Sequence, residues 1–113
     1  LADWFESLDR LAETLDPDVL VLPAHGRPFT GVHQRLAQLR DEHEEGLQKL
    51  RGLCREPRRA VDVFQALFRS RIDDRSLIMA TGEALSHLHY LEEAGEIRRE
   101  TDHDGVNWYR LRQ

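Results

Sequence analysis

A near-heptad repeat in the middle of the chain constrains the fold more than any other feature. Residues suited to a buried helix face recur at Val32, Leu36, Leu39, His43, Leu47, Leu50 and Leu53 or Cys54. This spacing is that of an α-helix with one buried face, and Thr30 is a suitable residue to cap it. Glu56-Pro57 ends the pattern, because proline cannot continue a helix. The sequence therefore predicts one long connecting helix within residues 31–56.

A shorter amphipathic helix and an apolar strand are predicted before the long helix. The short helix has one apolar face, formed by Trp4, Leu8, Leu11 and Leu15, and Asp16-Pro17 ends it. Residues 19–22 are a continuous apolar run, typical of a strand buried on both faces. The Pro-Ala-His-Gly-Arg-Pro segment that follows disfavours both an α-helix and pairing in a β-sheet. We therefore expect His25 in a tight loop at the carboxyl end of the strand, where α/β folds build their sites.

The last part of the chain predicts two more helices and a hairpin. Apolar spacing indicates helices from Ala60 to Phe68 and from about Asp74 to Ala94, with Gly82 as a possible break in the second. Two strand-like segments, Ile97–Thr101 and Val106–Leu111, are joined through Asp-Gly, a strong hairpin signal. Helices followed by such a hairpin favour a winged-helix-like arrangement.

Composition limits the class of protein further. The one cysteine, Cys54, excludes an internal disulfide and the multi-cysteine zinc sites, and we expect it to pack as a small apolar residue. No apolar run is long enough to cross a bilayer, and the first residues lack a signal-peptide pattern. We therefore expect a cytoplasmic protein with no membrane contact. Because the sequence starts without methionine, we interpret it as a fragment of a longer parent protein.

The segment around His25 carries a resemblance to a known family. The string Asp-Val-Leu-Val-Leu-Pro-Ala-His-Gly-Arg-Pro, preceded by Trp-Phe-Glu-Ser-Leu-Asp-Arg-Leu, resembles the last strand and final motif of metallo-β-lactamase-superfamily hydrolases. Downstream, residues 86–97 resemble the stretch that closes the small C-terminal domain of lactamase-beta-like and glyoxalase-II-like members. Ala24 departs from the family, which usually has glycine there.

This resemblance implies an α+β, mostly helical fold. Residues 1–30 would be the last helix, strand and loop of an αββα metallo-β-lactamase domain. Residues 31–56 would form the long connecting helix, and residues 57–113 a winged-helix-like C-terminal domain. The resemblance therefore implies the C-terminal segment of a zinc-dependent hydrolase, in which this segment flanks the substrate cleft.

The resemblance also implies one metal ligand, His25, the last of a site that holds two zinc ions in the parent. The other family ligands precede this stretch, so the segment alone should be inactive and bind zinc weakly or not at all. The His87-Leu88-His89 string is not a second site, because helix residues two apart point about 200° apart. We expect His33, His43 and His103 to be structural or exposed.

Charge suggests where a substrate could approach. The chain has a net charge of −5, yet residues 46–75 carry eight basic and four acidic side chains. This basic stretch is either a solvated face or the mouth of the site, and in the second case Arg58, Arg59 and Arg71 are the candidates for substrate binding. The substrate in the parent would be an anionic small molecule, such as an ester or thioester, or single-stranded RNA.

The alternative is a free-standing winged-helix nucleic-acid-binding or dimerisation module. Duplex DNA is disfavoured, because the helix before the hairpin offers Glu83, Glu92 and Glu93 where a DNA reader needs basic residues. A homodimer built on the long helix is compatible with either interpretation.

Overall fold

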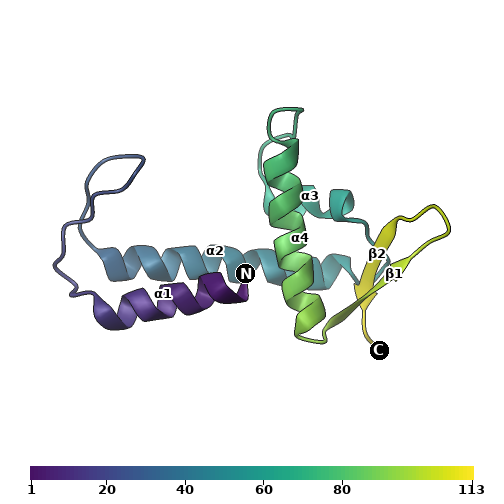
Figure 1. Ribbon diagram of the computed structural model, residues 1–113, viewed down its shortest axis with the longest axis horizontal. Helices are drawn as coiled ribbons and strands as arrows, with labels where there is room; N and C mark the ends of the chain where they lie inside the picture. The colour runs from purple at the N-terminus through teal and green to yellow at the C-terminus, as the bar shows by residue number, and fades with distance from the viewer. The chain divides into compact units, whose positions relative to one another are not determined.

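The computed structural model describes residues 1–113, and it divides into two units, Leu1–Glu44 and Glu45–Gln113 (Figure 1). Helix α2 (Val32–Leu53) contributes residues to both units. None of the helices combines the length and the apolar character that crossing a membrane requires. The division into residues 1–30, 31–56 and 57–113 stays a prediction.

The first unit is a pair of helices joined by a long loop. Helix α1 (Ala2–Thr14) runs antiparallel to the first part of α2 (Figure 1). The apolar core of the first unit contains Phe5, Leu8, Val32 and Leu36. The side chain of Arg40 donates to the Phe5 carbonyl oxygen at 3.2 Å and pairs with Asp9. The two predicted helices are thus confirmed, although α2 starts one residue later than a Thr30 cap requires. Gly31 takes the cap position, because its carbonyl accepts the first helical bond, from Arg35.

The predicted strand over residues 19–22 is wrong. Only Val21 pairs, through two backbone bonds of 2.8 and 3.1 Å to Phe29. Leu20 and Leu22 are 62% and 73% exposed rather than buried. A strand buried on both faces needs neighbouring strands and covering layers, and the described residues supply neither here. The apolar run therefore forms one β-bridge at the base of a loop.

The second unit is a small helical domain closed by a hairpin. The predicted helix 60–68 is divided into a 3-10 turn, η1 (Ala60–Val63), and a short helix, α3 (Phe64–Leu67). Helix α4 (Leu77–Glu93) runs without a break through Gly82, so the break considered there is absent. The core of this unit includes Leu47, Leu50, Cys54, Val63, Phe64, Ala80, Ala84, Leu88, Leu91, Ile97 and Tyr109. Cys54 packs as expected, and burial raises the pKa of its thiol.

The hairpin is the predicted one. Strands β1 (Ile97–Thr101) and β2 (Asn107–Leu111) are antiparallel, in the register that pairs Ile97 with Leu111. The Asp102 carboxylate organises the turn by accepting bonds from the backbone of Asp104 and Val106 and from the Trp108 ring nitrogen. These hydrogen bonds lower the pKa of Asp102, and the bond from Trp108 has the largest effect. The unit is mostly helical with a two-stranded sheet, while its interpretation as a winged helix stays a prediction.

Candidate functional site

His25 lies in a short exposed loop of the first unit. The Val21–Phe29 bridge closes this loop, and Gly26, with a φ of 95°, reverses the backbone beside the histidine. The His25 side chain is exposed and makes no hydrogen bond or ion pair within residues 1–113. His25 therefore lies in a tight loop, as the sequence predicted, although the strand expected before it is absent; its imidazole is open to solvent rather than packed in a core.

As a metal site, this loop is incomplete. A zinc site with catalytic function takes three protein ligands and keeps an open position. Within residues 1–113, His25 belongs to no group of three histidine, cysteine or carboxylate side chains with ligand atoms close together. The accessible imidazole fits one ligand position, and any further ligands would have to come from elsewhere.

The other histidines have structural surroundings within their own units. His33 Nε2 lies 2.6 Å from the Leu15 carbonyl oxygen, and His43 Nδ1 lies 2.7 Å from that of Leu39. His103 in the hairpin turn is exposed. These positions agree with the expectation that the three histidines are structural or exposed.

His87 and His89 diverge on helix α4 as their spacing predicts. His89 is exposed, whereas His87 is 4% exposed and its Nδ1 lies 2.7 Å from the Glu83 carbonyl oxygen. Gly46 leaves room for this ring, because a Cβ at that position would lie 3.2 Å from His87 Nε2. The buried ring therefore depends on a glycine in the neighbouring helix.

The structure does not gather Arg58, Arg59 and Arg71 into one anion site. Arg58 is half-buried, and its Nε donates to the Leu53 carbonyl oxygen at 3.1 Å. Arg59 forms a fork to the Asp62 carboxylate at 2.8 and 3.0 Å, which raises the pKa of Arg59 and lowers that of Asp62. Arg71 is exposed in the loop before α4. Of the three arginines, only Arg71 has an exposed guanidinium that no hydrogen bond or ion pair engages.

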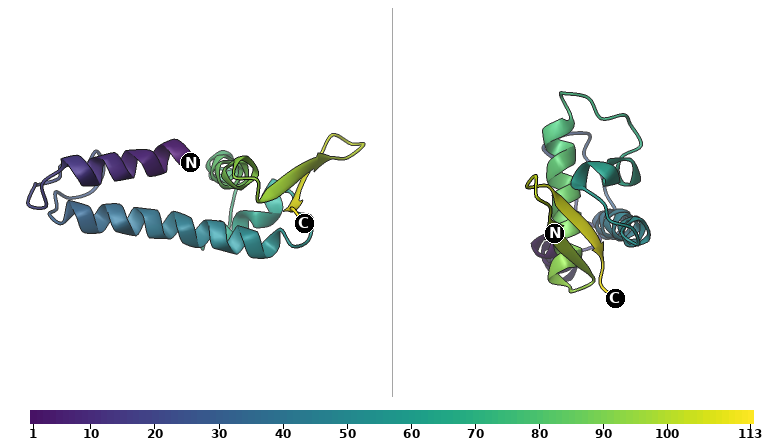
Figure 2. Two further views of the ribbon diagram at one scale, coloured as in Figure 1. Left: turned by 90° about the horizontal axis from the view of Figure 1, so that it is seen from below. Right: turned by 90° about the vertical axis from the view of Figure 1, so that its right-hand side faces the viewer.

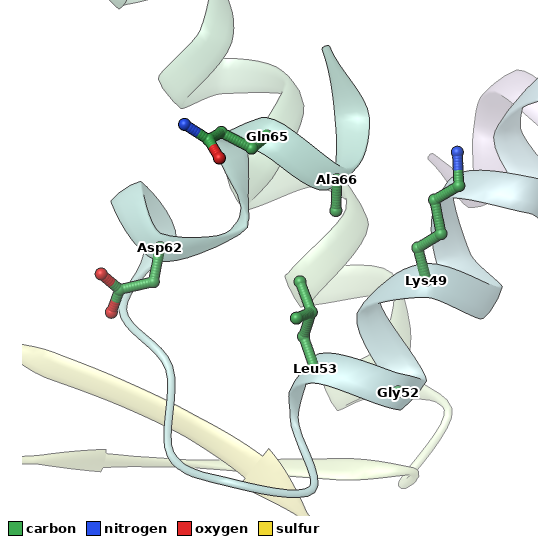
Figure 3. Close-up of a pocket in the computed structure, with 6 residues that line it drawn as sticks. All are labelled: Lys49, Gly52, Leu53, Asp62, Gln65 and Ala66. Atoms are coloured by element: carbon green, nitrogen blue, oxygen red, sulfur yellow. The ribbon is translucent and has the colours of Figure 1, made fainter. Parts of the chain in front are cut away.

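One open pocket, which sequence reasoning missed, lies between the end of α2 and the η1–α3 segment. It has a volume of about 490 Å³ and is lined by Lys49, Gly52, Leu53, Asp62, Gln65 and Ala66. In Figure 3 the side chains of Leu53 and Ala66 point toward one another across it, while the polar groups of Asp62 and Gln65 lie at its rim. Lys49 and Asp62 are already engaged by Glu45 and Arg59. The pocket is thus a mainly apolar depression whose two ionisable side chains already pair with residues outside it.

The fold and its site define a class: a small helical domain closed by a β-hairpin, preceded by a helical pair whose loop presents a histidine. Comparison with known proteins identifies the family. Residues 47–112 match the model of the metallo-beta-lactamase-like C-terminal domain, and the chain belongs to this family. The resemblance seen in the sequence is thereby confirmed.

Two solved structures are similar over nearly the whole chain. One is a beta-lactamase domain protein from Burkholderia ambifaria, 44% identical, with a TM-score of 0.89 over 96% of this chain and 32% of that one. The other is a metallo-beta-lactamase family protein from Thermus thermophilus, 31% identical, with a TM-score of 0.80 over 99% of this chain and 33% of that one. The chain thus spans about a third of the length of these proteins. No curated protein sequence matches it.

Proposed function

We propose that the chain is the C-terminal segment of a zinc-dependent hydrolase with a metallo-β-lactamase fold, and that His25 supplies the last metal ligand. The observation that carries this proposal is the extent of the similarity. It covers 99% of the chain in one solved relative, well beyond the matched domain at residues 47–112. It therefore extends into the segment in which His25 stands exposed on a turn.

His25 has the properties that a ligand needs in this proposal. A neutral imidazole binds zinc through one ring nitrogen at about 2.0–2.1 Å, and no internal hydrogen bond competes for either nitrogen of His25. The bridge between Val21 and Phe29 fixes both ends of its loop. A pair of zinc ions held there would supply a water of lowered pKa and polarise the scissile group. The remaining ligands would come from outside residues 1–113.

The substrate in this proposal is an ester, a thioester or an RNA phosphodiester, and the second unit flanks the cleft. Arg71 supports an anionic substrate, because it is exposed and makes no ion pair within 4.0 Å. Arg58 and Arg59 would act only if substrate displaced their partners, the Leu53 carbonyl and the Asp62 carboxylate.

The direct test uses the parent protein with His25→Ala and, as a matched control, His103→Ala. His103 is also exposed, in the hairpin turn. We expect His25→Ala to lose bound zinc and hydrolytic turnover together, by at least about tenfold, while His103→Ala keeps both. Unchanged zinc content and turnover in His25→Ala would remove His25 from the site.

A dimerisation module is the second candidate, and one observation favours it. Leu77, Ile78 and Met79, in the first turn of α4, are 45%, 83% and 72% exposed. Contiguous exposed apolar side chains often mark an interface. If this turn forms a dimer, sedimentation velocity will show a dimer that Ile78→Glu dissociates; a monomer at all concentrations would exclude it.

A further inference from the structure

Helix α4 has one face that the rest of the chain leaves exposed. Its other face buries Ala80, Ala84, Leu88 and Leu91 in the core of the second unit. Residues three and four apart share one side of a helix, and one such row, on the side opposite the buried residues, is exposed at every position. We call this row the outer face of α4; its members are Arg75, just before the helix, and Met79, Gly82, Ser86, His89 and Glu93. The right-hand view of Figure 2 shows α4, in green, as one continuous helix between the loop before it and the hairpin.

Gly82 lies in the middle of the outer face, and nothing inside the chain requires a glycine there. Glycine in a helix interior is less favourable than alanine, yet a Cβ at Gly82 would meet no atom within 4 Å. Gly46 is different, because it makes room for His87. The distance between two packed helices depends on the side chains at their contact. Gly82, with the small Ser86 one turn later, would let a second helix approach α4 closely.

The two ends of the outer face carry opposite charges, each of the sign that its helix end disfavours. The N-terminal end of a helix favours anions and the C-terminal end favours cations, whereas here Arg75 lies at the first end and Glu93 at the second. Both side chains are exposed, and neither has an ion-pair partner within 4.0 Å. Each end would therefore gain from a charge that the chain itself does not supply.

The neighbouring charges keep this difference in sign. Residues 69–76 carry three arginines and two aspartates, and one of these aspartates accepts backbone hydrogen bonds in the turn before α4. Residues 92–96 carry three glutamates and no basic residue, and two of these glutamates already pair with arginines of the same unit. The N-terminal end thus stays net positive, while one glutamate remains unpaired at the C-terminal end.

The spacing of the outer face is symmetric. Its six members form three pairs, placed nine, five and two positions to either side of residue 84. The pairs are Arg75 with Glu93, Met79 with His89, and Gly82 with Ser86. When two identical helices pack antiparallel, a residue before the centre lies opposite the residue equally far after the centre in the other copy. The outer face is therefore complementary to itself in the antiparallel direction.

We propose that two copies of this chain pair through the outer faces of α4, antiparallel, about a twofold axis beside residue 84. Each of the three pairs would form twice across this axis, with Arg75 against the partner's Glu93 at both ends. The two helix dipoles would oppose one another, and each disfavoured end charge would meet its opposite. The proposal rests on the dimer considered above, to which it gives a face and a register, and is independent of the zinc ligand proposed at His25.

Sedimentation velocity on the full 113-residue chain measures the association. One pair of short helices makes an interface below the about 1,200 Å² of standard complexes, so we expect a reversible dimer with a micromolar dissociation constant. A monomer at every concentration up to about 1 mM would overturn the proposal and the dimer together. A parent protein that stays monomeric where the chain dimerises would assign the outer face to a contact within the parent, and would overturn it too.

Exchange of the end charges tests the register. Arg75→Glu and Glu93→Arg should each weaken the dimer at least about tenfold, because each places like charges opposite one another twice. The double variant should regain most of the affinity, and so should an equimolar mixture of the two single variants, since every contact again joins opposite charges. The two positions lie about 27 Å apart along one helix, so this recovery cannot arise within one copy. Both changes suit the helix dipole, so the monomer should stay folded by circular dichroism.

Gly82→Gln tests the close approach, with Gly52→Gln as its matched control. Both glycines are exposed in helices, and a Cβ at either would meet nothing within 4 Å. Glutamine is a good helix former, so both variants should keep or raise the melting temperature. Only Gly82→Gln should weaken the dimer, by at least about tenfold, because its side chain would separate the two helices.

Two further outcomes would overturn the proposal. One is a dimer that Ile78→Glu dissociates but that the end-charge variants leave unchanged, since the dimer would then use a different register or face. The other is an equal loss of affinity in Gly82→Gln and Gly52→Gln. The zinc content of the parent distinguishes these failures from a failure of the hydrolase proposal, because none of the substitutions touches His25.

Discussion

The His25 loop and the hairpin domain differ in whether the strands that their sequences predict actually form. The sequence predicts strands in both, from a continuous apolar run at residues 19–22 and from strand-like segments joined through Asp-Gly in the hairpin. The hairpin strands form because β1 and β2 pair with each other and Ile97 and Tyr109 enter the core of the same unit. Residues 19–22 have only Phe29 to pair with, and both of their leucines are exposed. The comparison teaches that a segment with a strand signal forms a strand only where its pairing and packing partners are present.

The largest expected effect lies in the core of the second unit. Leu88 is fully buried in α4, so Leu88→Ala should lower the free energy of unfolding by about 2–5 kcal/mol through lost burial and a cavity. Ile78→Ala, on the same helix but 83% exposed, should change it by less than about 0.5 kcal/mol. Urea denaturation followed by circular dichroism measures both, and equal effects would contradict this assignment of the core.

Alanine substitutions at two glycines of α2 should change the stability by smaller amounts, with opposite signs. A Cβ at Gly46 would lie 3.0 Å from Leu67 Cδ2 and 3.2 Å from His87 Nε2, whereas a Cβ at Gly52 would meet nothing within 4 Å. Gly46→Ala should therefore destabilise by about 1–2 kcal/mol, as overpacking exceeds the gain in helix propensity. Gly52→Ala should stabilise by about 0.5–1 kcal/mol. The same denaturation experiment tests both, and a stabilised Gly46→Ala would show that Leu67 and His87 do not pack there.

The ion pair between Arg51 and Glu96 predicts a modest pH dependence. Hydrogen bonding from Arg51 lowers the pKa of Glu96 below its usual 4.5. The carboxylate thus favours the folded state above pH 4.5, and this contribution is lost as the pH falls through the lower, folded-state value. For a half-exposed pair the effect should be no more than about 1 kcal/mol. Unfolding free energies of the wild type and Glu96→Gln should converge in acid; a constant difference would exclude the linkage.

The smallest effect is expected in the loop of the first unit. Leu20→Ser and Leu22→Ser should change the stability of the 113-residue chain by less than about 0.5 kcal/mol, because both side chains are already exposed. Thermal melts are the measurement. A loss above about 1 kcal/mol in either variant would mean that the apolar run is buried in solution and that the comparison between the two regions fails.

The sequence predicted what depends on local periodicity and turn chemistry. The apolar spacing located α1, α2 and α4, and the Asp-Gly turn located the hairpin. It placed His25 in a loop but could not supply the long-range pairing that a buried strand requires. The fork between Arg59 and Asp62 was also missed, since a list of arginines does not show which carboxylates they engage. Side chains alternate along a strand, so the outward position of Trp108 and Arg110 on β2 could be predicted once the inward face was known.

Zinc binding to this segment and to its parent tests the account most directly. Equilibrium dialysis, run in parallel on the 113-residue chain and on the parent protein, measures the zinc retained by each. The account predicts about two ions per parent molecule and weak or no retention by the segment, where His25 has no companion ligands. Tight, stoichiometric zinc on the segment, or a parent that retains none, would contradict it.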